Sequence, residues 1–385
     1  MTRFRTEPLG KIAPAESRRE IAPLPNPCWL LNLDQIEKEA GYLSERTLID
    51  PSTASASTHQ FTVDHVLYSK LRPNLSKVVC PKEGGLCTTE LVRLKPDQRK
   101  IDRQFLTYFL RSASFVGFAS QAVAGAKTPR LMMNQLWHFP VPVPPPADQR
   151  RIVEILDLAD ELRRKRREGV EIARRIPTAA FHKAFDGVLD RSKPATVEQV
   201  FDDTSRMGPR LPRTTYLSSG RFPVIDQGAD MVAGFTDMPE DLYTGPLPVI
   251  LFGGHTRIFK LIRQPFAIGA DGVRLLSPKS GWFPEFAFQQ CRMLEIPAAG
   301  YSRHYKFLRE QGFFHAPPAQ QKHFAEAFRE HESVLEKKFA AQSHLDTLFT
   351  TLLERAFAGG LTREGRSGTM RETLQEMEIQ ARRQP

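Results

Sequence analysis

The chain has 385 residues, 41% of them hydrophobic, so two domains with separate cores fit within its length. No run approaches the roughly 18 apolar residues of a membrane span, and residues 1–7 lack the apolar core of a secretory signal, so we expect a cytoplasmic protein without a membrane partner. The formal net charge of +10 favours a polyanion such as nucleic acid as the partner, because each neutralised phosphate releases counterions.

Residues 1–144 are predicted to form a first domain of mixed helices and strands. Two stretches have helical spacing and three have strand-like composition, namely 33–42 and 105–118, and 60–68, 76–80 and 90–94. The turn signals Arg72-Pro73-Asn74 and Glu83-Gly84-Gly85 separate the strand-like runs. The domain ends in residues 139–146, where frequent prolines exclude a helix and a central strand and predict an extended segment.

A long spacer helix is predicted over residues 145–192. Pro145, Pro146 and Asp148 suit its first turn, the aspartate through the helix dipole. The apolar residues that follow have heptad-like spacing and are Ile152, Ile155, Leu156, Ala159, Leu162, Ile172, Ala173 and Ile176. Pro177 is expected to kink or break the helix near its end. The charged run 163–168 is expected to form a solvated helix face, with a phosphate contact as the alternative.

A second mixed domain is predicted over residues 193–314, a second long helix over 315–361, and a charged tail over 362–385. The strand candidates of this domain are 222–226, 247–252, 266–268 and 273–276. The apolar positions of the second helix alternate three and four apart, which again fits a coiled-coil seam. They are Phe324, Phe328, Leu335, Leu345, Leu348, Phe349, Leu352, Ala356 and Phe357.

The segment that begins at Pro145 recurs at Pro317 with a constant offset of 172 residues and no gap. Identical pairs include Gln149/Gln321, Ala184/Ala356 and Phe185/Phe357. The domains also correspond, since 89–94 parallels 270–275 and 104–106 parallels 285–287. The repeat predicts an α+β fold with a pseudo-twofold plan of domain, helix, domain, helix, with two similar mixed α/β domains and two long helices of coiled-coil spacing. Such a plan favours a target with two halves.

Two loops in each domain concentrate side chains that suit DNA recognition, namely 68–77 and 125–130 in the first domain and 253–257 and 300–306 in the second. Arginine can bond guanine through two hydrogen bonds and asparagine can bond adenine in the same way, while lysine and threonine hold phosphates. One such loop would be an ordinary exposed loop, but four at corresponding places in two repeats favour DNA binding. The candidate DNA-binding residues are Lys70, Arg72, Asn74, Lys77, Lys127, Thr128, Arg130, His255, Thr256, Arg257, Arg303, His304, Tyr305 and Lys306.

No catalytic or metal signature accompanies these loops. The sequence has no Gly-x-x-x-x-Gly-Lys-Ser/Thr, Gly-x-Gly-x-x-Gly or His-Glu-x-x-His motif, so we assign no catalytic residue and no metal. Asn26-Pro27-Cys28-Trp29 resembles an element of amino-methyltransferases, but no glycine-rich strand–turn–helix for a methyl donor accompanies it. The acids between 226 and 241 are better explained as surface residues than as a nuclease site. The four cysteines lack metal-type spacing and are expected to be buried or incidental thiols.

The chain resembles a type I restriction–modification specificity subunit over residues 1 to about 361. The resemblance rests on the Pro-Pro-x-x-Gln/Arg start of each long helix, on the Ala-Phe-x-Gly sequences at 184–187 and 356–359, and on their repetition around two variable domains. Residues 70–74 and 89–96 are similar to the recognition domains of that family. Asp148 and Gln320 stand where the family usually has glutamate.

This resemblance implies a non-catalytic subunit in which each domain reads one half of a split double-stranded DNA sequence. The two long coiled-coil helices would pack antiparallel as a spacer that separates the two domains, and they would dock two methyltransferase subunits, with endonuclease subunits joining through the complex. S-adenosylmethionine, ATP and Mg²⁺ belong to the partner subunits of the family, so no cofactor is assigned. The candidate spacer and docking residues are Gln149, Ile152, Ile155, Leu162, Gln321, Phe324, Phe328 and Leu335.

Two other functions remain open from the sequence. A self-contained methyltransferase–nuclease that kept its recognition part here would bind S-adenosylmethionine, and a coiled-coil scaffold would show no DNA sequence preference.

The length of the long helices bears on the spacing of the two domains. A helix of about 30–39 residues spans roughly 45–60 Å, whereas one DNA turn is about 34–36 Å. Such a spacer would therefore hold two DNA-reading domains about one and a half turns apart.

Overall fold

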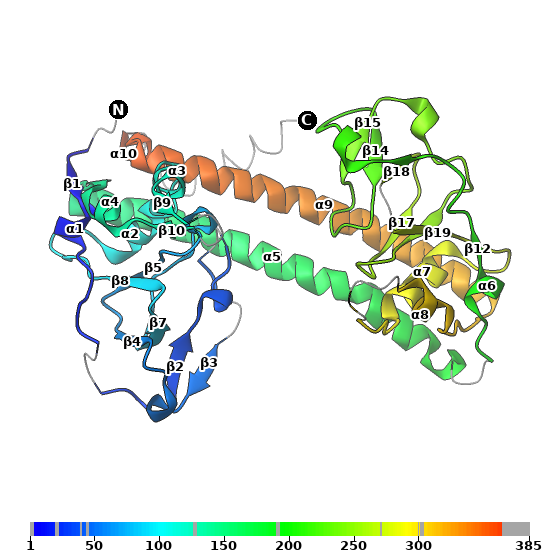
Figure 1. The fold of residues 1–385 in the computed structure, drawn as a ribbon, viewed down its shortest axis with the longest axis horizontal. Coiled ribbons are helices and arrows are strands. Elements are labelled where there is room, and N and C mark those ends of the chain that lie inside the picture. Colours follow the sequence, from blue (N-terminus) through cyan, green and yellow to red (C-terminus); the bar gives the residue numbers. More distant parts are fainter. Residues whose placement is uncertain are drawn as a thin grey trace. The chain divides into compact units, whose positions relative to one another are not determined.

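The computed structural model describes residues 4–19, 23–38, 41–43, 46–125, 129–189, 193–269, 272–298, 300 and 304–363 (Figure 1). The chain divides into two compact units. The first unit consists of Met1–Arg167 with Ala341–Pro385, and the second unit is Glu168–Ala340. Each unit thus contains one mixed domain and part of both long helices. The predicted order of domain, helix, domain, helix is confirmed, while the tail predicted over 362–385 lies outside the described residues from position 364 onward.

The mixed domain of the first unit contains short strands and short helices. Its strands are β1 (Thr6–Pro8), β2 (Cys28–Leu31), β3 (Thr47–Ile49), β4 (Thr58–Phe61), β5 (Val66–Ser69), β6 (Val78–Val79), β7 (Gly85–Thr88), β8 (Leu91–Leu94), β9 (Val123–Ala124), β10 (Arg130–Leu131) and β11 (Pro140–Pro142). Its helices are α1 (Leu9–Ile12), α2 (Arg103–Phe109), α3 (Ala113–Gln121) and α4 (Met133–His138). The larger sheets have the strand orders β3-β2-β7-β4 and β6-β5-β8.

Several predictions for this domain are corrected by local structure. Residues 105–118 form two helices rather than one, because Ser112 caps a new helix by accepting a hydrogen bond from the Phe115 amide at 3.4 Å. The stretch 33–42 is wrong as a helix, since it has only a 3-10 turn at Leu33–Gln35 before Ile36 pairs with Leu43 in an extended bridge. The run 60–68 is split into β4 and β5. The proline-rich segment is extended as predicted, and part of it pairs as β11 with β1.

The mixed domain of the second unit has two sheets, with strand orders β12-β19-β16-β17 and β13-β18-β14-β15. The strands are β12 (Phe201–Asp203), β13 (Arg210–Leu211), β14 (Phe222–Ile225), β15 (Gly234–Thr236), β16 (Val249–Gly253), β17 (Phe259–Ile262), β18 (Ala267–Gly269) and β19 (Val273–Pro278). The helices are α6 (Val197–Val200), α7 (Pro284–Met293) and α8 (Tyr305–Arg309). All four predicted strand regions therefore contain a strand, while β12, β13, β15 and β17 were not predicted.

The two long helices are α5 (Pro146–Leu189) and α9 (Pro318–Phe357), followed by α10 (Gly360–Arg363). The break predicted near Pro177 is wrong, because α5 continues through it to Leu189. The predicted seam of α5 is also partly wrong, since Leu162, Ile172 and Ile176 have 51%, 67% and 48% of their surfaces exposed. Arg163 is instead buried, so the prediction of a solvated face fails at that residue. Polar contacts, described below, explain why an arginine lies there.

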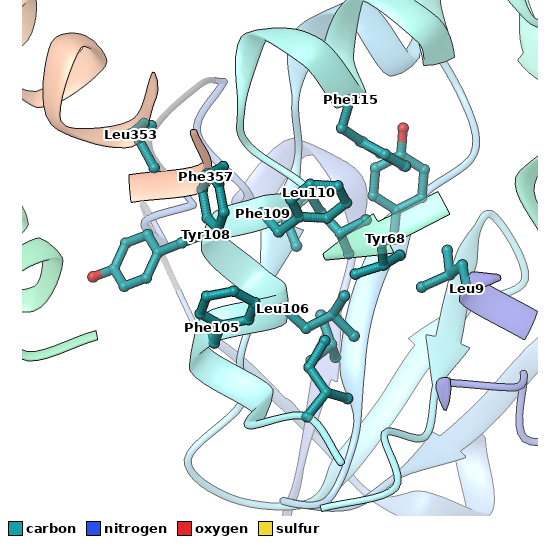
Figure 2. Packing of buried hydrophobic residues seen from close by; sticks show 14 of the residues in the cluster. Leu9, Tyr68, Phe105, Leu106, Tyr108, Phe109, Leu110, Phe115, Leu353 and Phe357 are labelled. Carbon is teal, nitrogen blue, oxygen red and sulfur yellow. The ribbon is translucent and has the colours of Figure 1, made fainter. Parts of the chain in front are cut away.

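In the first unit the core joins the mixed domain to both long helices. Figure 2 shows the part of it that Leu353 and Phe357 of α9 contribute. The ring of Phe357, from α9, lies 5.4 Å from that of Phe105 and 5.2 Å from that of Phe109, centroid to centroid, in edge-to-face contacts. Ile152 and Leu156 of α5 belong to the same buried cluster. Burying rings of this size removes large apolar areas from water, so α2 anchors the domain to the helices.

The same packing recurs in the second unit, where the end of α5 takes the place that the end of α9 has in the first unit. Phe286 of α7 lies 4.9 Å from Phe185 of α5, and Phe181 lies 5.4 Å from Phe324 of α9. Phe185 and Phe357 are the repeated phenylalanines of the two Ala-Phe-x-Gly sequences. Each therefore packs on the main helix of a mixed domain in its own unit, which explains why the repeat keeps a phenylalanine there.

Gln149 links the start of α5 to the mixed domain of the first unit. Its side chain is buried, and Nε2 donates hydrogen bonds to the carbonyl oxygens of Pro144 and Lys100, both at 2.8 Å. Its Oε1 accepts a hydrogen bond of 2.7 Å from the amide of Asp102, the residue that caps α2. One buried amide side chain thus satisfies three backbone groups from two segments.

Gln321 makes the same three kinds of contact at the start of α9. Its Nε2 donates to the carbonyl oxygens of Ala316 at 2.7 Å and Gly281 at 3.1 Å, and its Oε1 accepts from the amide of Phe283 at 3.0 Å. Phe283 precedes α7 as Asp102 precedes α2. The repeated glutamine is therefore a structural clamp in each unit, and we call this set of three bonds the glutamine clamp.

Candidate nucleic-acid interface

The two predicted loops of the first unit lie side by side. The amide of Arg72 donates to the carbonyl of Pro129 at 2.9 Å, and Leu71 pairs with Arg130 in an isolated bridge. The side chains of Arg72 and Asn74 are exposed next to this junction. The fold therefore brings together segments about 60 residues apart, and it presents two of the predicted base-reading side chains to solvent.

Other predicted residues of this loop pair hold the loops in place. The Lys77 ammonium donates to the carbonyl of Leu33 at 2.6 Å, and burial lowers the pKa of this lysine. Arg130 pairs with both carboxylate oxygens of Glu90, at 3.0 and 3.3 Å, which raises the pKa of Arg130. The side chain of Lys70 is half-buried. Lys77 and Arg130 thus have structural contacts within the domain, and their role in DNA binding stays a prediction.

The predicted loops of the second unit also meet. The amide of His304 donates to the carbonyl of Gly254 at 2.9 Å, and the His304 ring nitrogen Nδ1 lies 2.9 Å from the same oxygen. His304 is buried, so it positions the loop rather than offering a surface to DNA. His255, Thr256 and Lys306 are exposed beside it. The sequence did not distinguish the buried histidine from the exposed one.

Unusual backbone conformations mark the same loops. Within the described residues, the non-glycine residues with positive φ are Arg72 at 49°, Ser76 at 47° and Arg257 at 63°. All three fall in the predicted DNA-binding loops. Left-handed backbone at residues with a Cβ is uncommon and tends to cluster at functional sites, where the surrounding structure fixes it. The geometry therefore agrees with a binding role for these loops.

Two residues that the sequence did not single out hold the second loop pair. Gln227 accepts a hydrogen bond from the His255 amide at Oε1, 3.0 Å away, and its carbonyl accepts one from the Thr256 hydroxyl at 2.7 Å. Lys260, on β17, is buried and donates to the carbonyls of Asp226, at 2.8 Å, and Asp230. Lys260 thus fixes the turn that carries Gln227. The sequence feature that could have identified Lys260 is its position among the apolar residues of 259–262. No strand was predicted there, so this feature was not used.

Replacing Lys260 by methionine is expected to loosen the His255–Thr256 loop while leaving the core packed. Methionine fills a similar volume but cannot donate to the two carbonyls, so the turn around Gln227 loses its anchor. Hydrogen exchange measured by mass spectrometry should show faster exchange at the His255 amide, by about tenfold or more. Lys279→Met is the matched control, because Lys279 donates to the carbonyl of Glu198 at a more exposed site. Unchanged exchange in Lys260→Met would contradict this role.

Three of the predicted DNA-binding residues, Lys127, Thr128 and Arg303, lie outside the described residues. Arg257 is exposed and donates to the carbonyl of Ile296 at 2.9 Å. Tyr305 is half-buried, and the guanidinium carbon of Arg274 lies 4.8 Å from the centre of its ring. Burial, the largest cause, raises the pKa of Tyr305, so the phenol stays neutral at physiological pH.

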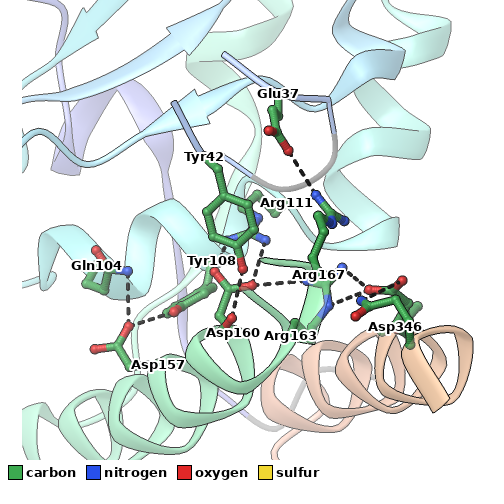
Figure 3. Close-up of polar contacts among 12 residues, drawn as sticks. Glu37, Tyr42, Gln104, Tyr108, Arg111, Asp157, Asp160, Arg163, Arg167 and Asp346 are labelled. Carbon is green, nitrogen blue, oxygen red and sulfur yellow. Dashed lines mark hydrogen bonds and ion pairs between the residues drawn. The ribbon is translucent and has the colours of Figure 1, made fainter. Parts of the chain in front are cut away.

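A polar network joins the long helices in the first unit (Figure 3). Arg163 donates to Asp346 of α9 at 2.7 Å and to Asp160 at 3.0 Å. Asp160 also pairs with Arg111 of the mixed domain at 3.3 Å, and its carbonyl accepts from the Tyr42 hydroxyl at 2.8 Å. This network occupies the place in the seam where the sequence predicted solvated charges. Buried charges are tolerated there because each has an opposite partner.

The predicted spacer and docking residues are mostly internal. Gln149, Ile152, Gln321, Phe324 and Phe328 are buried, and Ile155 and Leu335 are half-buried. Leu162 is the exposed member of the set. Their contacts fit a spacer role inside each unit, and the docking surface stays a prediction.

Within the described residues, no helix is both long and apolar enough to cross a membrane. No group of three His, Cys, Asp or Glu side chains in this part of the chain is placed to hold a metal ion. The cysteines are free, and Cys28, Cys87 and Cys291 are buried as expected.

Comparison with known proteins agrees with this geometry. The family model for the type I restriction modification DNA specificity domain matches residues 57–171, which include the first loop pair and the start of α5. A curated relative, the specificity subunit of the type I restriction enzyme EcoDI from Escherichia coli, is 29% identical over 156 residues. The match covers 40% of this chain and 34% of the relative, so the chain spans about a third of the relative's length.

Two solved structures share the fold over most of the chain. One is the type I restriction–modification system S subunit from M. genitalium, with a TM-score of 0.55 and 16% identity over 92% of this chain and 96% of the other. The second comes from a study of complex assembly and conformational transition of the type I restriction–modification system, with a TM-score of 0.53 and 18% identity over 93% and 98%. At such identities the likeness shows the fold alone. Residues 57–171 thus match the type I restriction modification DNA specificity domain, and the chain as a whole shares the fold of solved structures from type I restriction–modification systems.

Proposed function

We propose that this chain recognises a specific DNA sequence in two halves, one half read by each mixed domain. The recurrence of a paired loop in both units carries the proposal. Each pair presents exposed polar or cationic side chains, Arg72 and Asn74 in the first unit and His255 and Thr256 in the second. Each mixed domain is held to the long helices by a glutamine clamp. Rigid support of this kind is what precise base recognition requires.

We further infer that the chain is a non-catalytic subunit whose long helices dock methyltransferase subunits, through which endonuclease subunits join. The exposed apolar residues Leu158 and Leu162 on α5 support such a surface, because they have 42% and 51% of their surfaces open to solvent. Apolar side chains on a helix face are typical anchors for a partner protein. A subunit that acts on cellular DNA would work in the cytoplasm.

In vitro selection tests the first proposal. The full-length chain, with its methyltransferase partners where these are needed for tight binding, is incubated with duplexes of randomised sequence, and the retained DNA is sequenced. We expect two enriched blocks separated by base pairs without preference. A single continuous block, or no enrichment at all, would refute a split target.

Arg72→Ala is expected to relax sequence preference in one block, whereas His255→Ala relaxes it in the other. A side chain that bonds a base edge discriminates by about 1–3 kcal/mol, which corresponds to roughly 5- to 150-fold in relative affinity. The measurement is competition binding with single base-pair variants of the selected site. Arg99→Ala is the control, because Arg99 is 90% exposed and pairs with Asp97 outside the loops. Uniform weakening across all base-pair variants would mean that Arg72 contacts phosphates instead.

A further inference from the structure

A cationic cleft lies beside the second loop pair. It has a volume of about 650 Å³, and its lining includes Arg206, Arg210, Arg274, Lys306 and Arg309. No carboxylate side chain is among the described residues that line it. Gly254 and Lys306, which belong to the predicted DNA-binding loops, form part of its wall. The cleft is therefore continuous with the loops, although Arg206, Arg210, Arg274 and Arg309 were not among the predicted residues.

Carboxylates neutralise some of these cations from outside the cleft. Arg274 pairs with Asp203 at 3.0 Å, and Arg309 pairs with Glu198 at 2.6 Å. Arg309 has its pKa raised by the hydrogen bond to Glu198. These two pairs hold their guanidinium groups in place at the wall and cancel two of the five positive charges.

The other three cations have no carboxylate partner among the described residues. Arg210 donates to the carbonyls of Ser205 at 3.2 Å and Val273 at 3.0 Å, which orient its guanidinium group without neutralising it. Arg206 is exposed and has no hydrogen-bond or ion-pair partner within the described part of the chain. Lys306 has no ion-pair partner among those residues, and its Nζ lies 4.6 Å from the centre of the Phe307 ring. The cleft thus keeps an excess of positive charge directed at solvent.

The cleft wall and the His255 loop meet in close backbone packing at Gly254 and Gly272. Gly272 has φ of +89°, and a Cβ there would lie 2.8 Å from Cδ2 of His255. A Cβ on Gly254 would lie 2.7 Å from the carbonyl oxygen of Gly272. Both positions therefore require glycine, and they let the cleft wall and the His255 loop share one backbone junction. An anion bound in the cleft would fix the position of that loop.

We propose that this cleft binds phosphate groups of the DNA backbone next to the half-site that the second mixed domain reads. The inference rests on the proposed function and extends it to a phosphate-binding site formed chiefly by Arg206, Arg210 and Lys306. Arginine and lysine side chains bind phosphate oxygens well. An open cleft with excess positive charge would therefore hold the duplex in one register on the domain. Such contacts are independent of base sequence, so they can be tested before the target is known.

The test is the salt dependence of binding to a random-sequence duplex, measured by fluorescence anisotropy with the full-length chain. The slope of log K against log salt changes by about 0.9 for each phosphate contact in B-form DNA. The variant Arg206→Ala with Lys306→Ala should therefore lose about 1.8 from the magnitude of the slope. Arg206→Lys, which keeps the charge, should stay near the wild-type slope.

The matched control is Arg213→Ala with Arg221→Ala, which removes two exposed charges from the same domain outside the cleft lining. Equal slopes for the cleft variant and the wild type, or an equal loss in the control, would overturn the cleft proposal while leaving DNA recognition intact. If the wild type, with its methyltransferase partners where these are needed for tight binding, bound no duplex under any salt condition, the proposed function itself would fail.

A small phosphate is the other source of the same chemistry, and calorimetric titration with inorganic phosphate distinguishes it. Phosphate that binds the wild type and not the cleft variant, together with an unchanged DNA slope, would assign the cleft to a small anion and overturn the DNA proposal. Circular dichroism spectra of the variants establish that they are folded, which is expected because Arg206 and Lys306 are exposed.

Discussion

Replacing Gln321 by leucine should lower the free energy of unfolding of the second unit by about 3 kcal/mol. Leucine has a similar size but leaves the carbonyls of Gly281 and Ala316 and the amide of Phe283 without their partner. Each unsatisfied buried group costs about 1–3 kcal/mol, and partial relaxation keeps the total below the sum. Urea unfolding followed by circular dichroism should show a midpoint lower by roughly 1–2 M.

Gln320→Leu is the control, because Gln320 is the neighbouring glutamine and is exposed. It should change the midpoint very little, since exposed surface substitutions usually stay within about 0.5 kcal/mol. The corresponding change Gln149→Leu should affect the first unit as Gln321→Leu affects the second. Equal midpoints for Gln320→Leu and Gln321→Leu would show that the glutamine clamp adds nothing to stability.

Replacing Asp160 by alanine should destabilise the first unit by about 3–5 kcal/mol. The substitution removes the carboxylate between Arg111 and Arg163, whose side chains are 4% and 10% exposed. Removing one member of a buried ion pair is costly, because the remaining charge stays in a poorly solvated place. Arg163 would keep Asp346, so the loss is largest at Arg111. The measurement is again the urea midpoint.

Glu161→Ala provides the comparison for this prediction. Glu161 follows Asp160 on α5 but is 48% exposed and pairs with Lys165, and exposed pairs of this kind contribute about 0–1 kcal/mol. The salt dependence of the loss of stability separates the two variants further, since salt screens buried ion pairs much less than exposed ones. A loss at Asp160 as small as that at Glu161 would mean that the network has little effect on stability.

The loop residues show how far a candidate site can be predicted from sequence. Arg72, Asn74, His255 and Thr256 were chosen as loop side chains that suit contacts with DNA, and they are exposed in the structure. His304 was chosen by the same criterion, yet it is buried against Gly254. Side-chain chemistry is local to a residue, whereas exposure depends on what the chain packs around it.

The residues that support the site were harder to predict. Lys260 is 30 or more positions from the two carbonyls that it binds, and nothing in its immediate sequence names those partners. The cationic cleft likewise combines Arg206 and Arg210 with Lys306, nearly 100 positions away. Contacts over such separations arise only when the sheets of the second unit have formed.

The sequence by itself determined the repeat, the two long helices, the positions of the loops and the family resemblance. These features depend on local signals, namely apolar spacing, proline and glycine positions, and a segment that occurs twice. The tertiary structure alone decided that Gln149 and Gln321 are buried clamps, that Arg163 replaces an apolar seam residue, and that Leu162 is exposed. The physical reason is that a buried polar group is stable only beside its partners, and those partners come from distant parts of the chain.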